Sequence, residues 1–172
     1  MTFVDTFTPM ADHLRSEYGI TDKLTTSQLK LGINGLHVHN YVTDGLTFDS
    51  TSVKTGEWKA IQGITIDSWN ALSGKTVAIS MDVTWSNYKA VNNQSNRLGF
   101  EYGVHYSKSA TEWVGLWLNP PTESGTKHCV SIMKLPNDTA TSWEEGFFYN
   151  QVNSDCKFKV TNIKIVENPM GG

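Results

Sequence analysis

The sequence predicts an all-β protein, a jelly-roll β-sandwich preceded by a short N-terminal helical hairpin. From residue 36 onward, apolar and polar residues alternate with a period of two, and turn residues recur about every 8 to 12 positions, as in sandwiches. The 172 residues include six Trp, six Tyr, seven Phe and 14 Gly, and only 18% are charged. This composition favours strands over helices. We therefore expect a helical hairpin over residues 1–35 and the sandwich domain over residues 36–172.

The hairpin is predicted from two helix starts and two stops. Thr8 followed by Pro9 places proline at a first helical position, and Gly19 ends the apolar pattern that follows. A second start lies at Thr25, with a glutamine three residues later as in a capping box, and this helix ends at Gly35. Helices of about ten residues are marginal in isolation. We therefore expect the hairpin to pack on the sandwich or on another chain, as a docking or oligomerisation element.

Eight strands are expected near residues 36–43, 57–63, 75–86, 97–108, 111–119, 127–135, 145–152 and 156–166. In the third, alternate apolar residues from Val77 to Trp85 face the core, which turns Asp82 outward. In the last, the alternation slips at Thr161 and Asn162, which predicts a bulge. No helical pattern alternates with these strands, so a jelly roll fits better than a parallel sheet.

The fourth and fifth strands have an unusual polar face. The core parity of the fourth strand holds Leu98, Phe100, Tyr102, Val104 and Tyr106. Its opposite parity holds Arg97, Glu101 and His105, with glycines between them. On the fifth strand the apolar set leaves Trp113 and Trp117 on the non-core side, flanking Gly115. Burial under a neighbouring element and exposure as a flat platform are both open for these tryptophans.

An exposed platform of this kind would suit a sugar. One face of a pyranose ring consists of C–H groups that stack on an aromatic ring, and its hydroxyls need partners that donate and accept hydrogen bonds. Trp113 and Trp117 would form the plate. The polar partners would be Asp82, Arg97, Glu101 and His105, if their strands are neighbours in one sheet. The alternative is a solvated sheet face stabilised by weak cross-strand charge pairs.

The residue types point away from catalysis. Asp82 with Glu101, or Glu144 with Glu145, could reach the carboxylate separation of a glycosidase, but neither pair has a supporting motif. The sequence holds no Gly-rich phosphate loop, nucleophile elbow or Ser/His/Asp signature. We therefore expect a protein that is not an enzyme.

Charge and hydropathy exclude other classes of partner. The net charge of −3 comes without a basic stripe, so nucleic acid is not an expected partner. The first residues have no basic start followed by an apolar stretch, and no run is long and apolar enough for a membrane span. We therefore expect synthesis in the cytoplasm without a signal peptide, and no membrane insertion. A bridge between Cys129 and Cys156 is possible, but reduced thiols are usual in non-secreted domains.

Metal sites have little support in the sequence, and no cofactor is expected. His37 and His39 lie two residues apart and could share a metal, but no third ligand is indicated, so packing against the hairpin is the stronger interpretation. Asp44 and Asp49 lie in a loop that could hold a structural calcium ion.

Two stretches resemble known proteins. Residues 10–24, MADHLRSEYGITDKL, followed by 25–36, resemble helical segments in minor structural proteins of phages that infect Gram-positive bacteria, where LR-x-x-YG-x-TDKL precedes a β-domain. Residues 156–167, CKFKVTNIKIVE, resemble the last strand of carbohydrate-binding-module-like jelly rolls, including those on phage tail and baseplate proteins. In those jelly rolls GN-x-AT-x-W often follows, whereas here the chain continues as NPMGG.

The resemblance implies a division of work. The hairpin would dock or oligomerise with other virion proteins, and the sandwich would present a face to a host cell-surface or cell-wall saccharide. It thus implies a virion component of the tail, baseplate or fibre that forms a homo-oligomer, because many weak sugar contacts then act together. The alternative is a purely structural virion protein that makes only protein contacts.

Overall fold

The computed structural model describes residues 11–12, 15–16, 39–52, 58–61, 63–144, 146–150 and 152–167. Within the expected hairpin, the described residues 11–12 and 15–16 are helical, and Arg15 pairs with Asp12 at 2.7 Å. The rest of residues 1–35 lies outside the described residues. The hairpin and the domain boundary at residue 36 therefore stay predictions.

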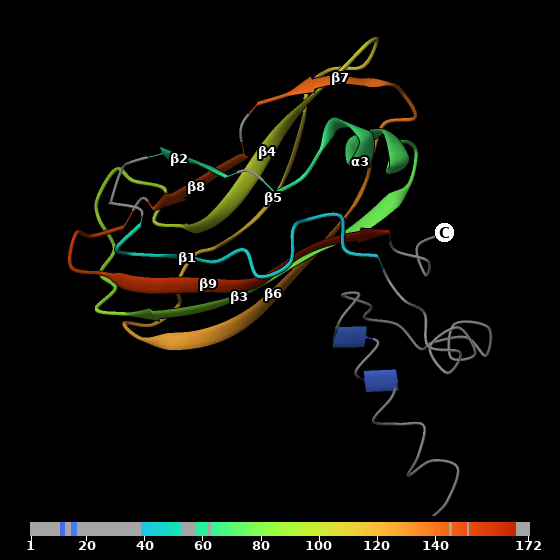
Figure 1. Cartoon of the computed structure of the whole chain (residues 1–172). Helices are drawn as coiled ribbons and strands as arrows, with labels where there is room; N and C mark the ends of the chain where they lie inside the picture. Colours follow the sequence, from blue (N-terminus) through green and yellow to red (C-terminus); the bar gives the residue numbers. More distant parts are fainter. Residues whose placement is uncertain are drawn as a thin grey trace, which may run out of the picture.

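Two antiparallel sheets pack face to face in the described part of the chain (Figure 1). The strands are β1 (Phe48–Asp49), β2 (Trp58–Ile61), β3 (Thr76–Ser86), β4 (Leu98–Tyr106), β5 (Glu112–Leu118), β6 (Gly125–Lys134), β7 (Ala140–Trp143), β8 (Gly146–Asn150) and β9 (Lys157–Glu167). One sheet has four strands in the order β1-β9-β3-β6. The other has five, in the order β2-β8-β4-β5, with β7 also paired to β4.

The strand pairing is that of a jelly roll. Strands pair as nested antiparallel partners, β1 with β9, β2 with β8, β3 with β6 and β4 with β5. The β1–β9 and β3–β6 pairs lie in one sheet, and the β2–β8 and β4–β5 pairs lie in the other. This alternation arises when one long antiparallel hairpin of strands rolls up into a sandwich. The predicted all-β jelly-roll sandwich is confirmed.

The core lies between the sheets and follows the predicted alternation. The apolar parities of β3 and β4 are buried, from Val77 to Trp85 and from Leu98 to Tyr106. On the outer parity of β3, Ala78 and Ser80 are also buried. Both are small, and their register partners on β6 are the larger Ile132 and Val130. The expected slip in β9 is present, because the register with β3 shifts between Ser80 and Asp82.

A short helix that the sequence did not predict closes one end of the sandwich (Figure 1). It is α3 (Ile66–Ala71), and the side chain of Thr65 caps it by accepting the Ser68 N–H. Trp69 is fully buried and contacts the Tyr102 ring edge to face at a centroid distance of 5.7 Å. This helix therefore covers the core where β3 and β4 leave it open.

Three strand predictions need correction. The strand expected at 36–43 is, over its described residues, only an isolated bridge between Asn40 and Val166. The strands β1 and β7 were not predicted, because the two residues of β1 are too few to show a pattern and the four residues of β7 lack a clear alternation. Cys129 and Cys156 are free and buried, and burial raises the pKa of both thiols. No described helix has the length and apolar character needed to cross a membrane.

Candidate functional site

Five of the six proposed site residues share one surface, here called the tryptophan face. It is the outer face of β4 and β5, which carries Glu101, His105, Trp113 and Trp117, together with Arg97, which directly precedes β4 and lies over Trp117. The register places Trp117 opposite Gly99, Gly115 opposite Glu101 and Trp113 opposite Gly103. Directly opposed residues of an antiparallel pair lie on the same side of the sheet. The face is therefore a row of large side chains on a floor of glycines.

Trp113 is the most exposed large apolar side chain of the face, at 47%. A Cβ atom added to Gly103 would lie 3.0 Å from Cζ3 and 3.1 Å from Cη2 of Trp113. The indole therefore rests over the glycine, where any larger residue would push it away. The sequence left open whether Trp113 is buried under a neighbouring element or exposed, and the structure shows that it is exposed to solvent.

Trp117 is half-buried and is covered in part by Arg97. The guanidinium carbon of Arg97 lies 4.2 Å from the Trp117 ring centroid, which is a cation–π contact. Here the strands approach so closely that a Cβ on Gly99 would come within 2.1 Å of the Leu116 carbonyl oxygen. Glycine is thus required at this position, and it brings Trp117 against the sheet.

Glu101 lies between the two indoles. Its register partner Gly115 is midway between Trp113 and Trp117, which are four residues apart, or about 13 Å along the strand. Burial raises the pKa of the Glu101 carboxyl, and the Arg97 guanidinium offsets part of this shift. Along the tryptophan face, the Glu101 carboxylate therefore lies between the indoles of Trp113 and Trp117.

His105 is held at the end of the face by two polar neighbours. Its Nδ1 lies 2.9 Å from the Thr111 hydroxyl, and its Nε2 lies 3.3 Å from Oε1 of Glu144. Glu144 is placed there because its backbone N–H donates to the Gly103 carbonyl at 2.7 Å. Sequence reasoning considered Glu144 only as part of an acidic pair. The contact with His105 was not predicted because the sequence did not reveal β7, the strand that pairs with β4 and directly precedes Glu144.

The backbone register continues across the five-stranded sheet beyond β4. Tyr149 of β8 lies opposite Gly99, and Trp58 of β2 lies opposite Tyr149. Trp58, Tyr149 and Trp117 thus occupy one level of the sheet across four strands. Sequence reasoning missed this row because it depends on pairing between distant segments.

Asp82 is not part of the tryptophan face, and the expectation that it shares a sheet with Arg97 and Glu101 is wrong. It lies on the outer side of β3, in the four-stranded sheet. Burial alone would raise its pKa, but hydrogen bonds at 2.6 Å from Asn162 and with His128 lower it. The alternation of apolar and polar residues along β3 predicts that Asp82 lies on the outer side of its sheet, but it does not predict to which of the two sheets β3 belongs.

Asp44 and Asp49, the latter at the end of β1, are engaged with their neighbours. Asp44 accepts from the Asn40 amide at 3.2 Å, and Asp49 accepts from the backbone N–H groups of Thr51 and Ser52. Over the described residues, no three His, Cys, Asp or Glu side chains come together as a metal site. The expectation that the protein has no cofactor stays a prediction.

Comparison with known proteins gives structural likeness only. No family model matches the chain, and no curated protein matches it in sequence. Among solved structures it is similar to "Family 16 Carbohydrate Binding Module-2", at 13% identity and TM-score 0.45 over 72% of this chain and 76% of the other. It is also similar to a structure described as "CBM4 structure and function", at 10% identity and TM-score 0.38 over 76% and 67%. At these identities and scores the likeness does not bear on what this chain binds.

Proposed function

We propose that the tryptophan face binds a saccharide chain without catalysing a reaction. The observation that carries this proposal is the placement of the Glu101 carboxylate between the Trp113 and Trp117 indoles on a glycine floor. Each indole can stack on the C–H face of one sugar ring, and the carboxylate between them can accept hydrogen bonds from sugar hydroxyls. Because Trp113 and Trp117 are about 13 Å apart along the strand, farther than one sugar ring reaches, an oligosaccharide is the expected ligand.

The flanking groups fit the same ligand. Arg97 donates several N–H groups and His105 with Thr111 offers a donor and acceptor pair, so both ends of the face can bind hydroxyls. Asp82 and Glu101 lie on the outer sides of opposite sheets, which are about 10 Å apart. They cannot flank one glycosidic bond, and this supports binding without hydrolysis.

We further propose that the protein is a phage virion component of the tail, baseplate or fibre. The support is the resemblance of residues 10–36 to helical segments of such proteins. In this role the protein is made in the host cytoplasm, oligomerises with itself, docks on other virion proteins and attaches to host saccharide. An affinity as weak as about 1 mM, roughly −4 kcal/mol, suffices for each site when several copies act together.

The test is a glycan array together with purified Gram-positive cell-wall polysaccharide, followed by calorimetric titration of the ligand identified. We expect Trp117→Ala to raise Kd about 2- to 12-fold, as the loss of one aromatic contact worth about 0.5–1.5 kcal/mol would. Ile132→Ala is the matched control, because Ile132 is an apolar side chain, 40% exposed, on the other sheet. Equal binding by Trp117→Ala and wild type would contradict the proposal.

A purely structural virion role is the second candidate. The exposed Ile132 on the edge strand β6 favours it, since exposed apolar residues on a sheet edge suit contact with a neighbouring subunit. This role predicts a stable oligomer in sedimentation that Ile132→Asp weakens, with no glycan bound. A monomer that binds glycan would remove it.

A further inference from the structure

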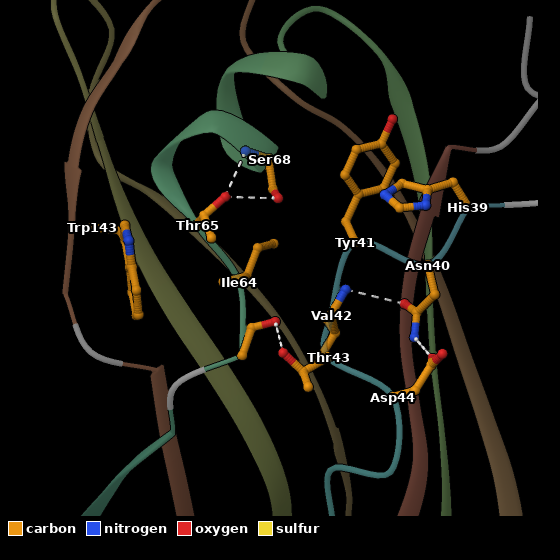
Figure 2. Close-up of a pocket in the computed structure, with 11 residues that line it drawn as sticks. His39, Asn40, Tyr41, Val42, Thr43, Asp44, Ile64, Thr65, Ser68 and Trp143 are labelled. Carbon is orange, nitrogen blue, oxygen red and sulfur yellow. Dashed lines mark hydrogen bonds between the residues drawn. The ribbon is translucent and has the colours of Figure 1, made fainter.

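A pocket of about 750 Å³ opens between residues 39–44, α3 and β7 (Figure 2). None of its lining residues belongs to the tryptophan face. The segment 39–44 runs beside β9, where the Tyr41 N–H donates to the Ile165 carbonyl, so this wall belongs to the four-stranded sheet. Trp143 of β7 forms the opposite wall and belongs to the five-stranded sheet. The pocket therefore lies where the edges of the two sheets diverge.

The walls and floor of the pocket are aromatic and apolar. The Trp143 indole is anchored from behind by the buried Tyr102 ring, at a centroid distance of 5.8 Å. Across the pocket stands Tyr41, with Ile64 between the two (Figure 2). Val42 and Ile64 are buried and form the floor. A flat ligand with one apolar face can thus be held against Trp143.

Three residues that line the pocket carry polar groups without a hydrogen-bond partner among the described residues. Oδ1 of Asp44 accepts from Asn40, but Oδ2 has no hydrogen bond within the described part of the chain. The Trp143 indole N–H and the Tyr41 hydroxyl likewise have none among the described residues. This lining therefore suits a ligand that offers both hydrogen-bond donors and acceptors.

We propose that this pocket is a second saccharide site, which binds one terminal, uncharged sugar unit. Its volume falls in the range of about 300–1,000 Å³ that is typical of small-ligand pockets. The Trp143 indole would stack on the C–H face of the ring, and the three unpartnered groups would bind hydroxyls. A pocket between two opposite walls suits the end of a chain, whereas the open tryptophan face suits its middle. The Asp44 carboxylate disfavours acidic sugars, since like charges repel.

This proposal does not rest on binding by the tryptophan face, and indole NMR separates the two. We would follow the six Trp N–H resonances of the full chain during titration with methyl glycosides of glucose, galactose and N-acetylglucosamine, and with methyl glucuronide. We expect a saturable shift of the Trp143 signal with at least one neutral glycoside, and none with the glucuronide. The shift should persist in Trp117→Ala, which damages only the tryptophan face.

Two matched variants complete the test. Asp44→Ala should weaken the affinity measured at Trp143 about tenfold, as for the loss of a hydrogen bond to a charged group. Asp67→Ala removes an exposed acid of α3 that does not line the pocket, and it should leave the affinity unchanged. The proposal is overturned if no neutral glycoside shifts Trp143 at tens of millimolar, if the glucuronide binds equally well, or if Asp44→Ala binds like wild type.

Discussion

Replacing Gly103 with alanine places one atom under the Trp113 indole. The added Cβ would lie 3.0 Å from Cζ3, whereas carbon atoms in favourable contact are about 3.5–4.0 Å apart. The ring edge must therefore retreat by about 0.5–1 Å, which it can do because Trp113 faces solvent. Alanine also restricts the unfolded chain, which stabilises by about 0.4–1 kcal/mol. We expect the free energy of unfolding to change by less than about 1 kcal/mol.

Binding should respond more than stability. If a sugar stacks on Trp113, a tilted ring loses up to the 0.5–1.5 kcal/mol of one aromatic contact, so Kd should rise roughly 2- to 12-fold. Calorimetric titration with the array-identified oligosaccharide gives Kd, and urea unfolding gives stability.

Gly99→Ala is the contrasting variant. Its Cβ would meet the Leu116 carbonyl oxygen at 2.1 Å and Trp117 Cα at 2.6 Å, both of which are backbone atoms that cannot turn aside. We expect a loss of about 1–3 kcal/mol in stability, as for other overpacked sites. The reasoning is refuted if Gly103→Ala binds like wild type, or if it destabilises as strongly as Gly99→Ala.

Three further predictions concern stability. Burial raises the pKa of Glu101, so its stabilising contribution is present below the unfolded pKa of about 4.3 and lost as pH rises through the folded value. Glu101→Gln should thus melt higher than wild type at pH 7, and a melting difference that grows on acidification would contradict this. Hydrogen bonds from the Ser107 hydroxyl and the Lys108 N–H to Asp138 hold the pKa of that carboxyl well below its usual range. The melting temperature of Asp138→Ala should therefore be lower than that of wild type at pH 7, and the difference should narrow as acid protonates the wild-type carboxyl. Equal melting temperatures at pH 7 would show that these hydrogen bonds to Asp138 do not stabilise the fold. Thr65→Ala removes the cap of α3 and should cost about 1 kcal/mol in urea unfolding, whereas an unchanged midpoint would show that the cap contributes nothing.

Local patterns predicted much of the sandwich. Alternation along β3 and β4 identified their buried residues, and the slip near Asn162 identified the bulge in β9. These features depend on neighbouring residues, which the sequence displays directly. The same alternation placed Trp113 and Trp117 on the outer side of one strand.

Features that depend on distant segments could not be predicted. Asp82 was assigned to the wrong sheet, because alternation gives a side of a strand but not its partners. Glu144 reaches His105 only through β7, whose short sequence has no distinctive pattern. The helix α3 was missed because six residues with one cap carry too little periodicity.

Acrylamide quenching of tryptophan fluorescence, with and without the array-identified oligosaccharide, tests the saccharide-binding face most directly. Wild type should be quenched readily without saccharide and become protected and blue-shifted at saturation. Most of that change should disappear in the double variant Trp113→Phe/Trp117→Phe, which leaves Trp143 in place to report on the pocket. Equal protection in wild type and the double variant, or no protection at millimolar saccharide, would contradict the assignment of the binding site to the tryptophan face.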